Sequence, residues 1–181
     1  MSNLSGLIIA KSDSKRLKNK NAKNFLGKPM FLWNVEKCVG IFEKTYVSSD
    51  SDAILKLAKK AGAIPIKRPK ELCGNTPNIP VYQHCWEQMG KPDGIVAVQA
   101  NSPAIDRRLI ILAMRLLEFG NQEIMTCHLN YDIYGSIWAL TKERLFVYET
   151  DYEFRHPCPD ILILDPSEDI HTLKDFKKAE K

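Results

Sequence analysis

The sequence predicts a three-layer αβα fold, in which helices cover both faces of a mainly parallel, Rossmann-like sheet. Short apolar runs alternate with segments of helical periodicity along almost the whole chain. The expected helices are long enough to form the crossovers that parallel strands need. The 181 residues, of which 44% are hydrophobic, suit a domain with a substantial core. Because no repeat, low-complexity tract or linker divides them, we expect a single domain over residues 1–181.

The first half of the chain is expected to form strand 7–10, helix 29–39, strand 44–49, helix 51–62, strand 63–66, helix 79–90 and strand 94–99. The strands are short runs of mostly apolar or β-branched residues, and the last is apolar enough to be buried on both faces. Pro29 suits the first turn of the first helix. Ser51 or Asp52 is expected to cap the second helix, and Gly62 to end it.

The second half is expected to form helix 106–120, strands 123–127 and 134–140, strand 161–164 and helix 171–181. The first of these helices carries an apolar stripe of helical period, and Thr172 lies near the cap of the last. The segment 155–160 holds one His and one Cys, which is too few for a zinc site, so a loop is expected there. Trp33, Trp86 and Cys85 fall in helical apolar patterns and are expected in the core.

Charge and cysteine content limit the possible functions. The net charge is +4, from 26 basic and 22 acidic residues, and much of the excess lies in the first 28 residues. Such a local cluster favours a defined anionic ligand over a nucleic acid, and no aromatic residues alternate with it for base stacking. Five cysteines without a C-x-x-C pattern indicate a reducing compartment. No run approaches membrane-spanning length, so we expect a cytoplasmic protein without membrane association.

Four polar loops follow directly after expected strands, at residues 11–24, 48–52, 99–107 and 166–172. Because ligands bind beyond the carboxyl ends of the strands in open parallel sheets, we expect these loops to surround one site.

The first loop is strongly basic and lacks glycine. Its cationic residues are Lys11, Lys15, Arg16, Lys18 and Lys20. The backbone amides of residues 12–15, beside Ser14 and Lys15, are expected to form a cradle for an oxyanion. The pattern is neither a Walker A motif nor G-x-G-x-x-G. A solvated lysine-rich loop is the alternative.

Five sequence blocks resemble, in order, those of the CMP-sialic acid and CMP-Kdo synthetases, the sugar-acid cytidylyltransferases. They are IAKSDSKRLKNKN (9–21), YVSSDS (46–51), RPKELCGNT (68–76), VQANSPAIDRR (98–108) and DIHTLKDFKKAE (169–180). The first is similar to A-R-x-x-S-K-x-x-x-x-K-N, and the last to D-I-D-T-x-x-D-x-x-x-A-E. The resemblance implies a sheet of the nucleotide-diphospho-sugar transferase type. It also implies that an oxygen of an acidic acceptor attacks the α-phosphate of CTP and releases pyrophosphate, with Mg²⁺ and lysines neutralising charge.

The resemblance further implies roles for single residues. Those expected at the nucleotide are Lys11, Ser12, Asp13, Ser14, Lys15, Lys20, Asn21 and Arg68. Among them Asn21 would contact base and ribose, and Arg68 would contact cytosine. Those expected at the acceptor are Gln99, Asn101, Ser102 and Arg107. Lys11, Lys15 and Asp169 would be catalytic, and Asp169 would bind Mg²⁺ with His171 at the place of a second carboxylate. Independently of the resemblance, Arg107 and Arg108 follow a strand-end loop, and cations are unfavourable in the first turn of a helix, which favours a clamp on an acidic acceptor over an ordinary helical role.

Two departures from the family pattern concern charged groups. Lys11 replaces an arginine and loses the planar fork that binds phosphate in two places. His171 replaces an acid, although Mg²⁺ prefers oxygen ligands. Several alternatives are open: Asp165 or Glu168 takes over, substrate phosphates suffice, the metal is a different one, the site is weak, or His171 has only a capping or solvent-exposed role.

Further departures concern the acceptor region. Ala100 replaces a proline, and Tyr134 and Trp138 stand in a strand that normally carries an asparagine. Only 31 residues separate Pro103 from Gly135, where the family carries a longer dimerisation insertion. We therefore expect a monomer or a different dimer, and a smaller or more open acceptor pocket.

The leading hypothesis is a Mg²⁺-dependent cytidylyltransferase for CTP and a sialic acid or related sugar acid. A small phosphonate is an alternative acceptor. A catalytically weakened nucleotide-binding protein, acting as a sensor or partner subunit, is a second hypothesis, motivated by the DIH sequence. Nucleic-acid binding through the first loop is the third, and it predicts strongly salt-dependent affinity.

Overall fold

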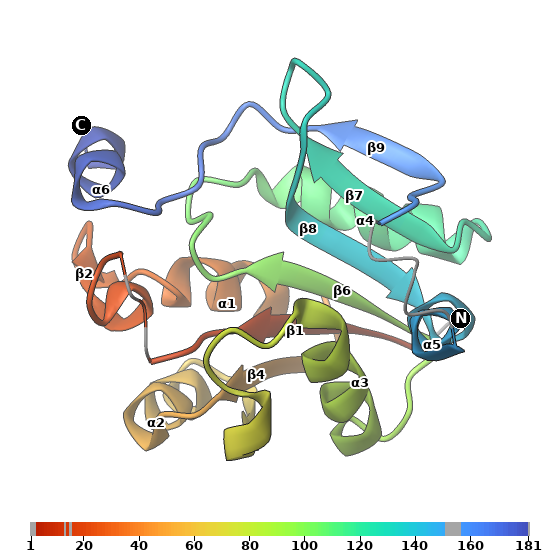
Figure 1. Ribbon diagram of the computed structural model, residues 1–181, viewed down its shortest axis with the longest axis horizontal. Helices are drawn as coiled ribbons and strands as arrows, with labels where there is room; N and C mark the ends of the chain where they lie inside the picture. The colour runs from red at the N-terminus through yellow and green to blue at the C-terminus, as the bar shows by residue number, and fades with distance from the viewer. Residues whose placement is uncertain (1–2, 13, 15, 151–156, 181) are drawn as a thin grey trace.

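The computed structural model describes residues 3–12, 14, 16–150 and 157–180, which form a seven-stranded sheet flanked by helices (Figure 1). The strands are β1 (Leu4–Ile9), β4 (Thr45–Ser49), β5 (Ile64–Lys67), β6 (Gly94–Gln99), β7 (Glu123–Cys127), β8 (Ile133–Thr141) and β9 (Ile161–Leu164). Their order is β5-β4-β1-β6-β8-β7-β9. Only β8 runs antiparallel to its neighbours in this sheet. The predicted mainly parallel α/β class is confirmed.

Helices pack on both faces of the sheet. Those on the sheet are α1 (Leu32–Val39), α2 (Asp52–Lys60), α3 (Asn78–Gln88), α4 (Arg107–Glu118) and α5 (Lys142–Thr150), whereas α6 (Leu173–Ala179) packs elsewhere. Helices α1, α2 and α4 share one apolar cluster, and α3 and α5 share the other. Successive strand residues alternate between the two, as Leu7 packs with α3 and Ile8 with α1, because side chains along a strand point to opposite faces.

A third, smaller core joins the C-terminal helix α6 to a hairpin near the start of the chain. The hairpin consists of β2 (Asn24–Phe25) and β3 (Lys28–Pro29). Phe25 and Phe176 meet edge to face with ring centroids 5.3 Å apart, and Met30 and Ile170 complete the cluster. This packing carries the segment before α6 to the first basic loop.

The predicted helix 29–39 is wrong at its start. Pro29 lies in β3, and α1 begins at Leu32. The residues that turn the hairpin, Leu26 and Gly27, have φ of 49° and 93°, so they form a two-residue turn of the primed kind, which diverts the chain before a helix can begin. Helix α5 was also missed, since its sequence KERLFVYET carries only a weak amphipathic pattern.

Cap predictions agree with the structure. Ser51 caps α2, its hydroxyl accepting from the amide of Ile54 at 3.4 Å. Thr172 caps α6 in a capping box with Asp175. Trp86 and Cys85 are buried as predicted, whereas Trp33 is only half-buried against the third core. Within the described part of the chain, no helix is both long and apolar enough to cross a membrane.

Candidate functional site

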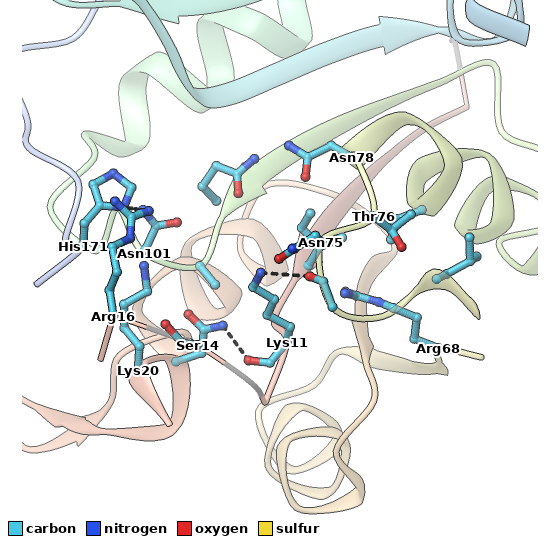
Figure 2. Close-up of a pocket in the computed structure, with 17 residues that line it drawn as sticks. Lys11, Ser14, Arg16, Lys20, Arg68, Asn75, Thr76, Asn78, Asn101 and His171 are labelled. Carbon is cyan, nitrogen blue, oxygen red and sulfur yellow. Dashed lines mark hydrogen bonds between the residues drawn. The ribbon is translucent and has the colours of Figure 1, made fainter. Parts of the chain in front are cut away.

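A cavity of about 340 Å³ lies among the segments that follow β1, β5 and β6 (Figure 2). The polar residues that line it are Lys11, Ser14, Arg16, Lys20, Asn21, Arg68, Asn75, Thr76, Asn78, Gln99, Asn101 and His171. The loops 11–24, 99–107 and 166–172 thus meet at one site, as the strand-end rule predicts. Asn75, Thr76 and Asn78 were not predicted as site residues, although the polar run GNTPN after the third predicted strand was a visible signal.

The cavity is strongly electropositive. Among the described residues that line it are four cationic groups, of Lys11, Arg16, Lys20 and Arg68, and no carboxylate. Lys11 Nζ donates to the carbonyl of Gly74 at 3.1 Å, and Lys20 Nζ to the carbonyl of Ile170 at 2.7 Å. Burial lowers the pKa of Lys20 to about 8, although Asp169 opposes the shift. Figure 2 shows these side chains around one space, which is therefore suited to an anion.

Arg68 is held rigidly at the wall of the cavity. Its exposure is only 6%, and burial lowers its pKa. The guanidinium donates through Nε to Ser48 Oγ at 3.2 Å and through Nη2 to the Ser48 carbonyl at 2.9 Å. The predicted loop 48–52 therefore does not line the cavity, but its residue Ser48 orients Arg68, which does.

The first loop differs in one respect from the expected cradle. The amide of Ser12 donates to Asp50 Oδ1 at 2.8 Å, and its hydroxyl donates to Asp50 Oδ2, so neither group is free for an anion. Burial acts to raise the pKa of Asp50, but these hydrogen bonds outweigh it and the pKa is lowered. Asn21 is buried and donates to the Lys11 carbonyl at 2.9 Å. The predicted site residues Asp13 and Lys15 lie outside the described residues.

Of the residues predicted at the acceptor, Gln99 and Asn101 line the cavity but Ser102 and Arg107 do not. Ser102 is fully buried and its hydroxyl donates to Asp169 Oδ1. Arg107 Nη2 donates to the carbonyl of Gly40 at 2.7 Å, and Arg108 pairs with Asp106. The expected arginine clamp is not formed at the cavity.

The predicted metal ligands lie beside each other. Asp169 Oδ2 is 3.6 Å from His171 Nε2, and burial raises the pKa of Asp169. Burial, with Lys20 nearby, lowers the pKa of His171. Both side chains also line a cleft of about 630 Å³ that contains Asp165 and Glu168.

Neither of those acids is placed to complete a metal site. The carboxylate of Asp165 accepts from Tyr134, Ser136 and Ser167, and Glu168 pairs with Lys178 at 2.7 Å. No group of three or more potential protein ligands was found in the described part of the chain. Asp169 therefore remains beside the His171 imidazole, while Asp175, which also lines the cleft, accepts from the backbone amides of His171 and Thr172.

A second cavity, of about 320 Å³, adjoins the first and shares Asn78 and Gln99 with it. Tyr134 and Trp138, which depart from the family pattern, line this second cavity. Gln99 Nε2 donates to the buried hydroxyl of Tyr82 at 3.3 Å, which orients its amide between the two spaces.

The fold and the paired cavities define an α/β protein with a strongly cationic cavity of small-ligand size. The chain belongs to a particular family within this class. The family described as Cytidylyltransferase matches residues 5–147.

The chain is similar to several proteins named as cytidylyltransferases. The chain is 44% identical over 95 residues to the Helicobacter pylori protein named pseudaminic acid cytidylyltransferase and UDP-2,4-diacetamido-2,4,6-trideoxy-beta-L-altropyranose hydrolase, covering 50% of this chain and 18% of that protein. It is 31% identical over 112 residues to a Campylobacter jejuni pseudaminic acid cytidylyltransferase, covering 58% and 48%. It is 30% identical over 115 residues to an Escherichia coli N-acylneuraminate cytidylyltransferase, covering 62% and 27%. The chain thus aligns with less than half of each relative.

Solved structures agree on the fold. A CMP:2-keto-3-deoxy-manno-octonic acid synthetase complexed with CTP has a TM-score of 0.80 at 13% identity, covering 99% of this chain and 97% of the other. A 4-diphosphocytidyl-2C-methyl-D-erythritol synthase from Anaerococcus prevotii has a TM-score of 0.72 at 11% identity, covering 99% and 95%.

Proposed function

We propose that this chain is a cytidylyltransferase that transfers CMP from CTP to a nonulosonic sugar acid and releases pyrophosphate. The observation that carries the proposal is the basic cavity joined through Gln99 to a second cavity. The first has the charge for a triphosphate, and the second has room for an acceptor beside it. The names of the relatives support cytosine as the base and a nonulosonic acid as the acceptor.

In the proposed reaction an acceptor hydroxyl oxygen attacks the α-phosphorus of CTP. A bond forms between that oxygen and phosphorus, and the hydroxyl proton passes to solvent water. The bond to the bridging oxygen breaks, and its electron pair leaves with pyrophosphate. Lys11, Arg16 and Lys20 would hold the triphosphate and offset the charge that develops on the leaving group. Arg68 would donate to the base, and Gln99 would orient the acceptor. Catalysis of this kind requires positioning rather than a covalent intermediate.

Of the two predicted metal ligands, Asp169 and His171, only Asp169 offers the oxygen ligand that Mg²⁺ prefers. That carboxylate would hold the ion together with phosphate oxygens and water, which is a usual arrangement for Mg²⁺ in nucleotide sites. Bound Mg²⁺ would neutralise charge on the triphosphate.

The test is pyrophosphate release from each of CTP, UTP, ATP and GTP with a panel of acceptors, in Mg²⁺ and in EDTA. We expect release with CTP and a nonulosonic acid, and a loss of about tenfold or more in kcat/KM for Arg68→Lys. The control is Lys18→Ala, which removes an exposed charge of the same loop that does not line the cavity. No release with any acceptor would refute the proposed reaction.

A nucleotide-binding protein without transferase activity is the second candidate. The observation that favours it is that the described residues contain no group of three or more potential metal ligands. Tight CTP binding without turnover on any sugar acid or small phosphonate would support it. Sedimentation of the purified chain would decide between a monomer and a dimer.

A further inference from the structure

Residues 169–171 connect the first basic loop to the loop after β6. Ser102 donates to Asp169, and the amide of Ile170 donates to the carbonyl of Asn101 at 2.8 Å. On the other side, the carbonyl of Ile170 accepts from Lys20 at 2.7 Å. His171 makes the remaining connection, and this residue is where the chain departs from an acidic pattern.

The hydrogen bond of His171 fixes its tautomer. Arg16 Nη2 lies 3.3 Å from His171 Nδ1 (Figure 2). A guanidinium only donates, so Nδ1 contributes its lone pair and the imidazole proton resides on Nε2. A histidine that binds a metal does the opposite, because its second nitrogen donates a proton to an acceptor. Metal at Nε2 would place a protonated Nδ1 against the donor group of Arg16.

We propose that His171 is a positioning residue that orients Arg16 toward the phosphates of the bound nucleotide, and that it is not a metal ligand. The identity of the nucleotide rests on the proposed function. Arg16 is exposed and long, so a fixed acceptor reduces the conformational freedom that it loses on binding.

A neutral acceptor suits this task better than the acid that it replaces. A carboxylate at position 171 would pair with Arg16 and offset its charge, whereas a neutral imidazole leaves that charge for the phosphates. This matters here because position 11 carries lysine, which binds phosphate through a single point charge. Arg16 is thus the cavity's exposed guanidinium, since Arg68 is buried against Ser48.

The experiment measures the dissociation constants of CTP and CMP by calorimetry in EDTA, which excludes any metal. We expect Arg16→Ala and His171→Ala each to weaken CTP binding about tenfold and to change CMP binding much less. His171→Asn should recover most of the CTP affinity lost in His171→Ala, because its amide oxygen can accept from Arg16. His171→Asp should weaken CTP binding. The double variant should bind CTP no more weakly than Arg16→Ala alone, since both changes remove one interaction.

The control is Lys18→Ala, which should bind CTP within about twofold of the unchanged protein. Additive effects of the two single variants, or failure of His171→Asn to recover affinity, would overturn the proposal. So would a Mn²⁺ dissociation constant, measured by electron paramagnetic resonance with CTP present, that rises about tenfold in His171→Asn.

Failure of the proposed role of His171 can be distinguished from failure of the proposed function. If the protein binds CTP but releases no pyrophosphate, the reaction is refuted and the binding comparison still decides the role of His171. If CTP does not bind, the same variants are compared with inorganic tripolyphosphate. Absence of binding to both probes would overturn both proposals.

Discussion

The pH dependence of CTP binding tests whether the charge of Lys20 contributes to binding the triphosphate. Its ammonium group is partly buried at the cavity, and burial lowers its pKa to about 8. The second pKa of a phosphate ester is about 6, so from about pH 8 to 9.5 the triphosphate is fully ionised, and a change in affinity over this range reports on the protein. CTP binds the protonated form, so affinity should be constant below about pH 7.5 and fall above pH 8. The fall should approach tenfold per pH unit until the pKa of Lys20 in the complex is reached.

The variant Lys20→Met keeps much of the side-chain length and removes the charge. A charge-assisted hydrogen bond contributes about 1.5–3 kcal/mol, and the lower half applies to a partly solvated group. The variant should therefore bind CTP about 10- to 40-fold more weakly at pH 7, with little further change up to pH 9.5.

Stability should respond to pH in the opposite direction. The pKa of lysine in the unfolded chain, about 10.4, is higher than the folded value of about 8, so the unfolded state binds more protons between these limits. The free energy of unfolding of the unchanged protein, relative to Lys20→Met, should rise over this range by about 1–2 kcal/mol after allowance for solvent screening.

Calorimetric titration with CTP at intervals from pH 7 to 9.5, and urea unfolding at the same pH values, measure the two effects. Lys18→Met is the control and should follow the unchanged protein in both. If the unchanged protein and Lys20→Met gave parallel binding curves, Lys20 would not be the titrating group, and the assignment of its charge to the triphosphate site would be wrong.

Three further variants test side-chain contacts that hold the cavity and the surrounding fold in place. Arg68→Lys should reduce CTP affinity about tenfold in calorimetry, because lysine cannot both donate twice to the Ser48 backbone and side chain and present a planar group to the base. Lys37→Met should lower the urea-unfolding free energy by about 2–4 kcal/mol, since Nζ donates to three acceptors around the loop after β6. Glu123→Ala should lower it by about 3–5 kcal/mol, because the fully buried carboxylate pairs with Arg144 at 2.7 Å. An unchanged unfolding midpoint in either of these two variants would contradict the assigned contacts.

Much of the site could be predicted because it follows strand ends. Lys11 and Asn21 lie in the loop after β1 and Gln99 ends β6, and all three line the cavity. Arg68 also lines it, but only the family resemblance predicted that residue. Roles within a loop were harder to predict. Neighbouring residues of an irregular segment point in different directions, so Asn101 lines the cavity while Ser102 turns inward to Asp169. No periodicity in the sequence distinguishes the two.

The sequence by itself determined the layered architecture and the edge of the sheet at which the ligand site forms. Alternating residues such as Leu7 and Ile8 require apolar cover on both faces, and parallel strands place their following loops at one edge. Only the tertiary structure decided how residues 169–171 contact the first loop. Arg16 and His171 are 155 positions apart, and Lys20 and Ile170 are 150 apart. Their contacts depend on α6 packing against the β2–β3 hairpin, and such a long-range pairing leaves no local pattern in the chain.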